Sequence, residues 1–321
     1  MTELQGHLAN LTETYWELVR ARSEYLQRQK LLANAETILN RLKGRAEVDA
    51  LDRQVYRASA AVSKRRAEIA RSLASIKNAE SRIRLLVNEP MLLNSAALEF
   101  TPVDLPDLAK LPLNLQDAVA TAIAHRQDIS SAIRAVTAAK IRNGVATNDL
   151  WPRLDLLIGT YVAGLDGDSD ALNSWVNQFK DGRPGFNVGF EFEIPVGNRA
   201  AQARKQQRQW ELTRAMHEFK ATVETGITEV EISVREVQTA YSEMTGRYHS
   251  MVAAENETEF LVDRWLTLPG VDDSVTLLLE DLLDSQERLA DEEAAFSKAL
   301  FDYAVATVRL KQAMGILFKV G

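Results

Sequence analysis

Residues 185–194 of the chain, GFNVGFEFEI, alternate apolar and polar positions with a period of two. Phenylalanine, valine and isoleucine occupy every second position, and asparagine, glycine and glutamate lie between them. This alternation predicts a β-strand with one apolar and one charged face. An upstream stretch, 152–163, alternates in the same way, with Leu154, Leu156 and Ile158 on one face. We therefore expect a β-hairpin over residues 151–196, with a loop at 165–185.

The two expected strands have the length, about 9 to 11 residues, and the aromatic outer face of transmembrane β-barrel strands. A sheet that covers the core of a soluble protein would show a similar alternation, so the pattern alone leaves both interpretations open. In a barrel, the candidate lipid-facing residues are Phe186, Phe190 and Phe192, and the candidate lumen-facing residues are Asp155, Glu191 and Glu193. In a soluble sheet, the same phenylalanines would belong to the core and the glutamates to the outer surface.

Long helices are expected on both sides of the strands. Residues 1–89 and 198–268 contain no proline, and apolar residues recur at every seventh position in four series. The series are Leu4, Leu11, Leu18, Tyr25, Leu32 and Leu39; Val48, Val55, Val62, Ile69, Ile76 and Ile83; Met216, Val223, Val230, Val237, Met244 and Met251; and Leu282, Leu289, Phe296, Tyr303, Leu310 and Leu317. This heptad spacing is typical of coiled-coil helices.

The chain also contains an internal repeat of a helical hairpin. Residues 11–18, LTETYWEL, parallel residues 237–244, VQTAYSEM, and the trio Ala79, Arg82 and Ile83 falls on Ala306, Arg309 and Leu310 at nearly the same offset. Each copy consists of a helix, a short turn and a return helix, with turns expected at 43–44 and 268–270. We predict a mainly α fold with a first hairpin at 1–89, a proline-containing linker or equatorial segment at 90–113, a helix at 114–150, the β-hairpin at 151–196 and a second hairpin at 197–321.

Composition excludes several classes of function. The 321 residues carry a net charge of −7 and no cysteine, so we expect neither nucleic acid as a partner nor a thiolate site. The four histidines are scattered without ligand spacing, and the carboxylates lie on heptad surfaces rather than in a grouped site. We therefore expect no metal, no cofactor and no enzymatic activity. No apolar run is long enough for a membrane-spanning helix, and the first residues do not form a signal peptide.

Several local motifs resemble the TolC-like outer-membrane efflux proteins, the outer-membrane factors of tripartite efflux and type I secretion systems. The similar stretches are HRQDI at 125–129, LWPRL at 150–154, GFNVG at 185–189, IPVGNR at 194–199, EDLLDSQ at 280–286 and VDALD at 48–52. They follow the family order over most of residues 8–318. Gln127 stands where the family has proline. We expect a fragment or short form that lacks the family's N-terminal helix and first strand pair.

The resemblance implies a homotrimeric conduit in which helical hairpins form a periplasmic α-barrel and the strands enter the outer membrane and contact its lipid. The expected partners are a periplasmic adaptor and an inner-membrane pump, and the expected cargo is small molecules or polypeptides. It also implies gate or tip residues, for which the candidates are Asp49, Asp52, Arg264, Asp281 and Asp284. The alternative is a soluble or peripheral coiled-coil scaffold without a pore.

Overall fold

The computed structural model describes residues 2–45, 52–93, 98–104, 106, 108–162, 175–176, 179–180, 184–194, 196–267 and 273–318. The chain divides into two compact units. One consists of Met1–Ile129 together with Val223–Gly321, and the other of Ser130–Thr222.

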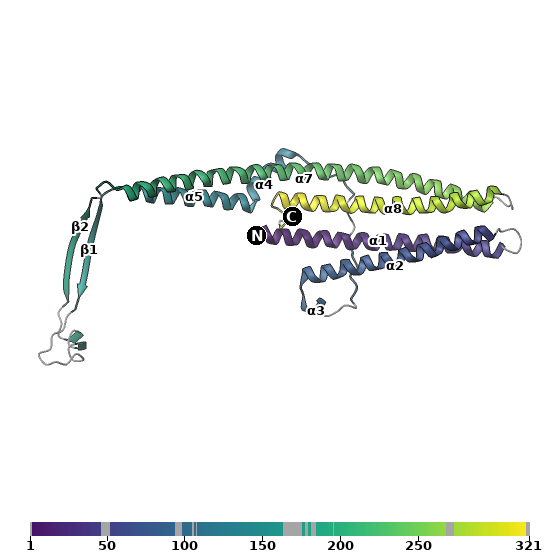
Figure 1. Ribbon diagram of the computed structural model, residues 1–321, viewed down its shortest axis with the longest axis horizontal. Coiled ribbons are helices and arrows are strands. Elements are labelled where there is room, and N and C mark those ends of the chain that lie inside the picture. The colour runs from purple at the N-terminus through teal and green to yellow at the C-terminus, as the bar shows by residue number, and fades with distance from the viewer. Residues whose placement is uncertain are drawn as a thin grey trace. The chain divides into compact units, whose positions relative to one another are not determined.

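Two long helical hairpins make up most of the first unit (Figure 1). The first hairpin consists of α1 (Thr2–Arg45) and α2 (Asp52–Val87), and the second of the C-terminal part of α7 (Arg199–Thr267) with α8 (Asp273–Ala313). Helix α1 packs against both α2 and α8 and so joins the hairpins. The predicted fold class, a mainly α chain with long antiparallel hairpins and one β-hairpin, is confirmed. Within the described ranges, no helix combines the length and the apolar composition required to cross a membrane.

The prediction of a turn at 43–44 is wrong, because α1 continues through Gly44 to Arg45. A glycine inside a helix costs only about 1 kcal/mol relative to alanine. Leu42, which is 4% exposed, belongs to a hydrophobic cluster at this end of the hairpins. Packing therefore holds the last helical turn in spite of the glycine. The second expected turn, 268–270, lies outside the described residues.

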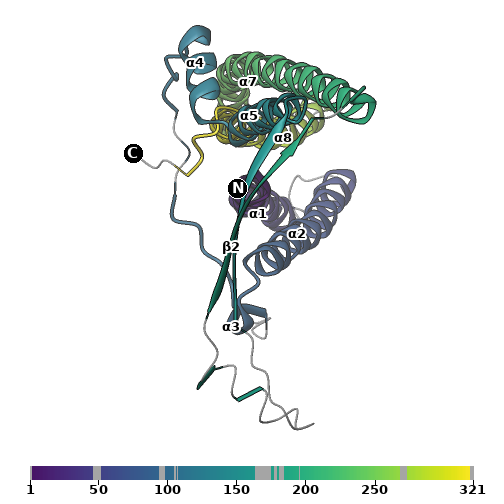
Figure 2. The same cartoon turned by 90° about the vertical axis from the view of Figure 1, so that its left-hand side faces the viewer.

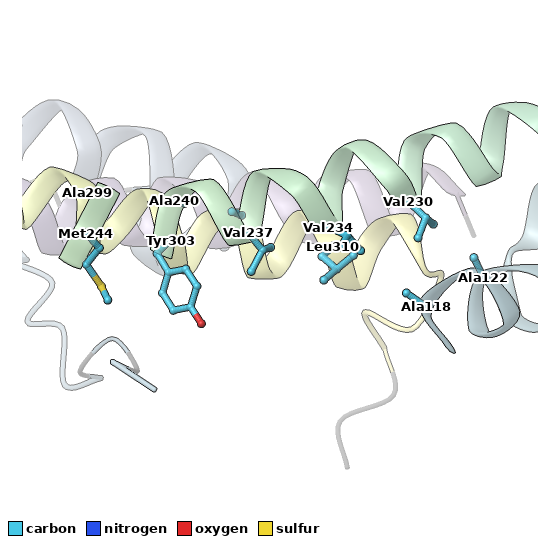
Figure 3. Packing of buried hydrophobic residues seen from close by; sticks show 11 residues of the cluster. Ala118, Ala122, Val230, Val234, Val237, Ala240, Met244, Ala299, Tyr303 and Leu310 are labelled. Atoms are coloured by element: carbon cyan, nitrogen blue, oxygen red, sulfur yellow. The ribbon is translucent and has the colours of Figure 1, made fainter. Parts of the chain in front are cut away.

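The helices bury their heptad positions in three separate clusters. One lies between α7 and α8 and includes Val230, Val237 and Leu310, with Ala118 and Ala122 of α4 (Leu115–His125) against it (Figure 3). A second lies near the turns of both hairpins and is centred on Leu279. The third lies between α1 and α2 around Leu18. Alanines at many of these positions let the backbones approach closely.

The linker contains the short helix α3 (Pro90–Leu93) and ends at α4. Asn114 begins α4, because its side chain accepts a hydrogen bond from the backbone N–H of Gln116. Arg126 has extended backbone angles and separates α4 from α5 (Gln127–Asn148). After α8, Gly315 adopts a φ of +73°, and a Cβ atom there would approach the carbonyl oxygen of His125 to 3.0 Å. This position therefore requires glycine.

The second unit contains most of α5, the N-terminal part of α7 and one antiparallel hairpin of β1 (Arg153–Tyr161) and β2 (Gly185–Glu193). In both views the strands run side by side as a long two-stranded ribbon (Figures 1 and 2). Pairing runs from Arg153 opposite Glu193 to Tyr161 opposite Gly185. Most of the predicted loop 165–185 lies outside the described residues.

Candidate functional site

The β-hairpin has one apolar face that combines side chains of both strands. In the observed register Leu154 lies opposite Phe192, Leu156 opposite Phe190 and Ile158 opposite Val188. Because partners in an antiparallel pair point to the same face, all these side chains gather on one side of the ribbon. Phe190 is 74% exposed and Phe186 is 71% exposed. The three phenylalanines predicted to face lipid therefore share a face, and none of the described residues covers that face.

The opposite face is charged. Asp155 lies directly opposite Glu191, and Arg153 lies opposite Glu193. The Nε of Arg153 is 3.0 Å from Asp155, and its Nη2 is 3.4 Å from Glu193. The structure thus brings together the three predicted lumen-facing carboxylates and adds Arg153, which the sequence analysis did not select. The sequence carried a signal for Arg153, because residues two apart in a strand point to the same face and Arg153 lies two residues before Asp155.

A close aromatic contact fixes the far end of this charged face. A Cβ atom on Gly185 would come within 2.5 Å of the ring of Tyr161, its partner across the strands. The tyrosine ring therefore lies over the glycine, which has no side chain of its own to pack. This contact specifies the register, because a shift by one residue would put a side chain under the ring.

The predicted tip residues are exposed and make no ion pair with one another in the part of the chain that the structure describes. Asp281 and Asp284 lie on the solvent side of α8, and Asp52 and Arg264 lie near the ends of α2 and α7. Asp49 falls outside the described residues. The structure places the four described residues at one end of the hairpins without joining them into a site.

Glu280 is the tip carboxylate that is engaged. It accepts hydrogen bonds from the guanidinium groups of Arg53, at 3.2 Å, and Arg57. The hydrogen bond from Arg57 lowers the pKa of Glu280, and the charge of Arg53 lowers it further. These contacts join α2 to α8, and therefore the first hairpin to the second. The sequence analysis did not predict these contacts. Which of the adjacent acids forms an ion pair depends on which helices pack together in the fold.

A buried arginine joins the same helices farther from the tip. Arg65 is 4% exposed, and its Nη1 donates to the carbonyl of Leu31 at 3.1 Å and to the side chain of Gln286 at 3.2 Å. Burial lowers the pKa of this guanidinium. Its partners belong to α1 and α8, so one side chain connects three helices. The sequence carried a signal for it, because Arg65 stands three residues after Val62 in the heptad series.

The linker is held on the helices by polar anchors. The hydroxyl of Tyr303 donates to the carbonyl of Ala109 at 2.8 Å and accepts from the N–H of Leu111 at 3.1 Å. On the first hairpin, the buried carboxylate of Glu80 accepts from the N–H of Phe100 at 3.1 Å. The segment from Phe100 to Leu111 is therefore attached to both hairpins.

Arg126 anchors the junction between α4 and α5. It forms two hydrogen bonds to Asp128, of 3.1 and 2.6 Å, one to Glu229 at 2.6 Å and one to the carbonyl of Ala313 at 3.1 Å. The hydrogen bonds to Asp128 raise the pKa of Arg126. Burial acts to raise the pKa of Asp128, but the bonds from Arg126 and from the N–H of Ile129 outweigh it, and the pKa is lowered. The arginine thus connects the linker side of the chain to α7 and to the end of α8.

Among the described residues, no group of three or more histidine, aspartate or glutamate side chains is arranged to hold a metal ion. The site therefore consists of the apolar and charged faces of the β-hairpin and of the polar contacts between helices. Such faces can bind lipid, water, ions or other helices.

The chain is similar to known proteins both in sequence and in fold. No family model matches the sequence. Over 334 aligned residues the chain is 23% identical to the outer membrane protein TolC of Vibrio cholerae, and the match covers 98% of this chain and 68% of that protein.

Solved structures show the same fold. The CmeC outer membrane channel of Campylobacter jejuni superimposes with a TM-score of 0.72 at 17% identity, covering 98% of this chain and 63% of that one. The open state of the MtrE outer membrane channel of Neisseria gonorrhoeae gives a TM-score of 0.73 at 18% identity, covering 98% and 67%. This chain therefore spans about two thirds of the length of these relatives. Its fold is that of the solved outer-membrane channels, and its sequence is similar to that of TolC along almost its whole length.

Proposed function

We propose that the chain is a subunit of an outer-membrane channel, a passive exit duct for small molecules or polypeptides. The observation that carries this function is the TolC-like fold over 98% of the chain. The uncovered apolar face of the β-hairpin supports it, because an isolated two-stranded ribbon is at best marginally stable in water. Contact with lipid and with strands of other subunits would cover that face and both edges. The alternative function, a scaffold without a pore, does not explain why the apolar face of the β-hairpin is exposed.

We further propose that the channel is a homotrimer that works with a periplasmic adaptor and an inner-membrane pump. In this assembly Phe186, Phe190 and Phe192 face lipid. Asp155, Glu191 and Glu193 line the lumen. The helical hairpins extend the conduit into the periplasm, and Asp281 and Asp284 lie at its tip. Rings of carboxylates at a narrow opening attract cations and repel anions, and their mutual repulsion favours an open tip.

The decisive test is to place a charge on each face of β2. Phe190→Asp puts a carboxylate on the apolar face, and Asn187→Asp puts the same group on the charged face of the same strand. On the lipid face of a barrel, a lysine or arginine costs about 2 to 4 kcal/mol near the bilayer midplane, and an aspartate costs less but still destabilises. We expect Phe190→Asp to abolish detergent-resistant trimers and single-channel conductance in planar bilayers, whereas Asn187→Asp retains both. Equal conductance in the two variants would refute a lipid-facing apolar face.

A further inference from the structure

Buried polar side chains interrupt the hydrophobic interior of the two hairpins on three helices. On α2, both buried residues between Val62 and Ile76 are polar. On α8, both buried residues between Leu282 and Ala290 are polar, and α7 contributes one buried threonine. We call this group the polar layer, and it consists of Arg65, Ser72, Thr258, Ser285 and Gln286.

The polar layer divides the interior into two parts. The cluster centred on Leu279 lies on the side of the turns and includes Val62 and Leu282. The cluster around Leu18 lies on the other side and includes Ile76. Within the described ranges, none of the three hydrophobic clusters extends across the layer. The turn ends of the hairpins therefore have a core of their own.

Arg65 carries a charge that is buried without a carboxylate in contact. Its guanidinium donates to the carbonyl of Leu31 at 3.1 Å, to the side-chain oxygen of Gln286 at 3.2 Å and to the carbonyl of Leu283 at 3.5 Å. All three acceptors are neutral. Burial lowers the pKa of Arg65, and the attraction of two nearby glutamates does not offset this effect. Removing the charge from water therefore costs more than nearby charges contribute.

The layer is also polar where it meets α7. The hydroxyl of Thr258 donates to the carbonyl of Ser285 on α8 at 3.2 Å. A hollow of about 30 Å³ adjoins Thr258 and Gln286, and Gln27 of α1 lines it as well. The Oε1 atom of Gln27 is buried and accepts no hydrogen bond from the described residues. A hollow of this size with a polar lining can hold a water molecule, so this part of the interior differs from a dry core.

We propose that the polar layer sets the register between the two hairpins and weakens their contact, so that the turn ends separate more readily than a continuous core would allow. Arg65 specifies which helices meet, because its acceptors lie on α1 and α8. A buried charge of this kind favours one pairing without adding net stability. The layer is a property of one chain, and its consequence for the opening of a duct rests on the proposed channel function.

Making the layer apolar tests this role. The first variant is Arg65→Met with Gln286→Leu, which replaces both members of one polar contact by apolar side chains. The second variant is Thr258→Val with Ser285→Ala, which leaves Arg65 in place and gives an independent result if the first does not fold. Arg65→Lys keeps the buried charge but loses the planar fork of donors. The matched control is Arg71→Met, at an exposed position of α2.

Amide hydrogen exchange of the full chain in detergent, followed by mass spectrometry, measures how readily the turn ends separate. We expect the first variant to slow exchange in a peptide covering 277–284 about fivefold or more, and the second variant to slow it as well. Arg65→Lys should accelerate this exchange, and Arg71→Met should leave it unchanged. Exchange in a peptide covering 303–310, beyond the layer, should change little in all four variants.

The outcomes separate the role of the layer from the function of the chain. Unchanged or faster exchange in either apolar variant that folds would show that the polar contacts stabilise the bundle, and would overturn the proposal even if the chain conducts in planar bilayers. Slower exchange together with a smaller open fraction in a conducting chain supports both the layer and the channel. Slower exchange in a chain whose wild type does not conduct supports the layer and counts against the channel function.

Discussion

Removing one hydroxyl tests whether the linker is held on the second hairpin as the structure indicates. Tyr303 is 3% exposed, so the ring of a Tyr303→Phe variant keeps its packing. The variant loses the donor to the carbonyl of Ala109, at 2.8 Å, and the acceptor for the N–H of Leu111, at 3.1 Å. At about 0.5 to 1.5 kcal/mol for each hydrogen bond, the expected loss is about 1 to 3 kcal/mol.

Hydrogen exchange measures this loss where it occurs. Because Leu111 loses its partner, exchange of its amide should accelerate about 5- to 150-fold if the linker opens locally. A peptide that covers 108–113, followed by mass spectrometry in detergent, reports this rate. Tyr241→Phe is the control, since the ring of Tyr241 lies 5.5 Å from that of Tyr303 but its hydroxyl has no hydrogen bond to the described residues. Unchanged exchange in Tyr303→Phe, or the same acceleration in Tyr241→Phe, would show that the hydroxyl does not anchor the linker.

Three further predictions concern the core, the Arg126 junction and the tip. Leu279→Ala removes a fully buried side chain and should cost about 2 to 5 kcal/mol, lowering the thermal midpoint in circular dichroism, while Leu277→Ala, at a 62% exposed position, should not. Because the pKa of Asp128 is lowered on folding, its contribution is present above the pKa of an unfolded aspartate and is lost as pH falls through the folded value. The midpoint difference between wild type and Asp128→Asn should therefore be clear at pH 7 and disappear in acid, and a difference that persists at low pH would contradict the assignment. Asp281→Asn with Asp284→Asn should reduce cation selectivity in reversal-potential measurements, and unchanged selectivity would exclude these carboxylates from the conducting path.

Periodicity predicted the elements because burial depends on local spacing. The alternation at 185–194 required every second side chain to share a face, and the register with β1 then fixed which residues lie together. The heptad series likewise predicted the long helices and their buried positions, such as Val230 and Leu310. The end of α1 was misplaced, since a glycine's helix propensity is small compared with the packing of Leu42.

Polar contacts between helices were harder to predict because they depend on tertiary neighbours. Glu280, Asp281 and Asp284 all carry a carboxylate and lie within five residues of one another in the sequence. Only Glu280 points toward α2, where Arg53 and Arg57 meet it. Arg65 is a different case, because its heptad position already indicated burial, and only its carbonyl partner on α1 required the structure.

The tip therefore contains two kinds of carboxylate with opposite physical effects. Glu280 shares two guanidinium groups that come from the other hairpin, so its charge attracts α2 to α8 and favours a closed bundle. Asp281 and Asp284 lie on the exposed side of the same helix, and in a ring of subunits their charges would repel one another. Salt screens exposed charges of both kinds, but a pair held in contact is screened less than charges separated across an opening. In the proposed trimer, low ionic strength should for that reason strengthen the repulsion across the opening more than it strengthens the contact between hairpins, and the balance between these neighbouring acids would then set how readily the proposed tip opens.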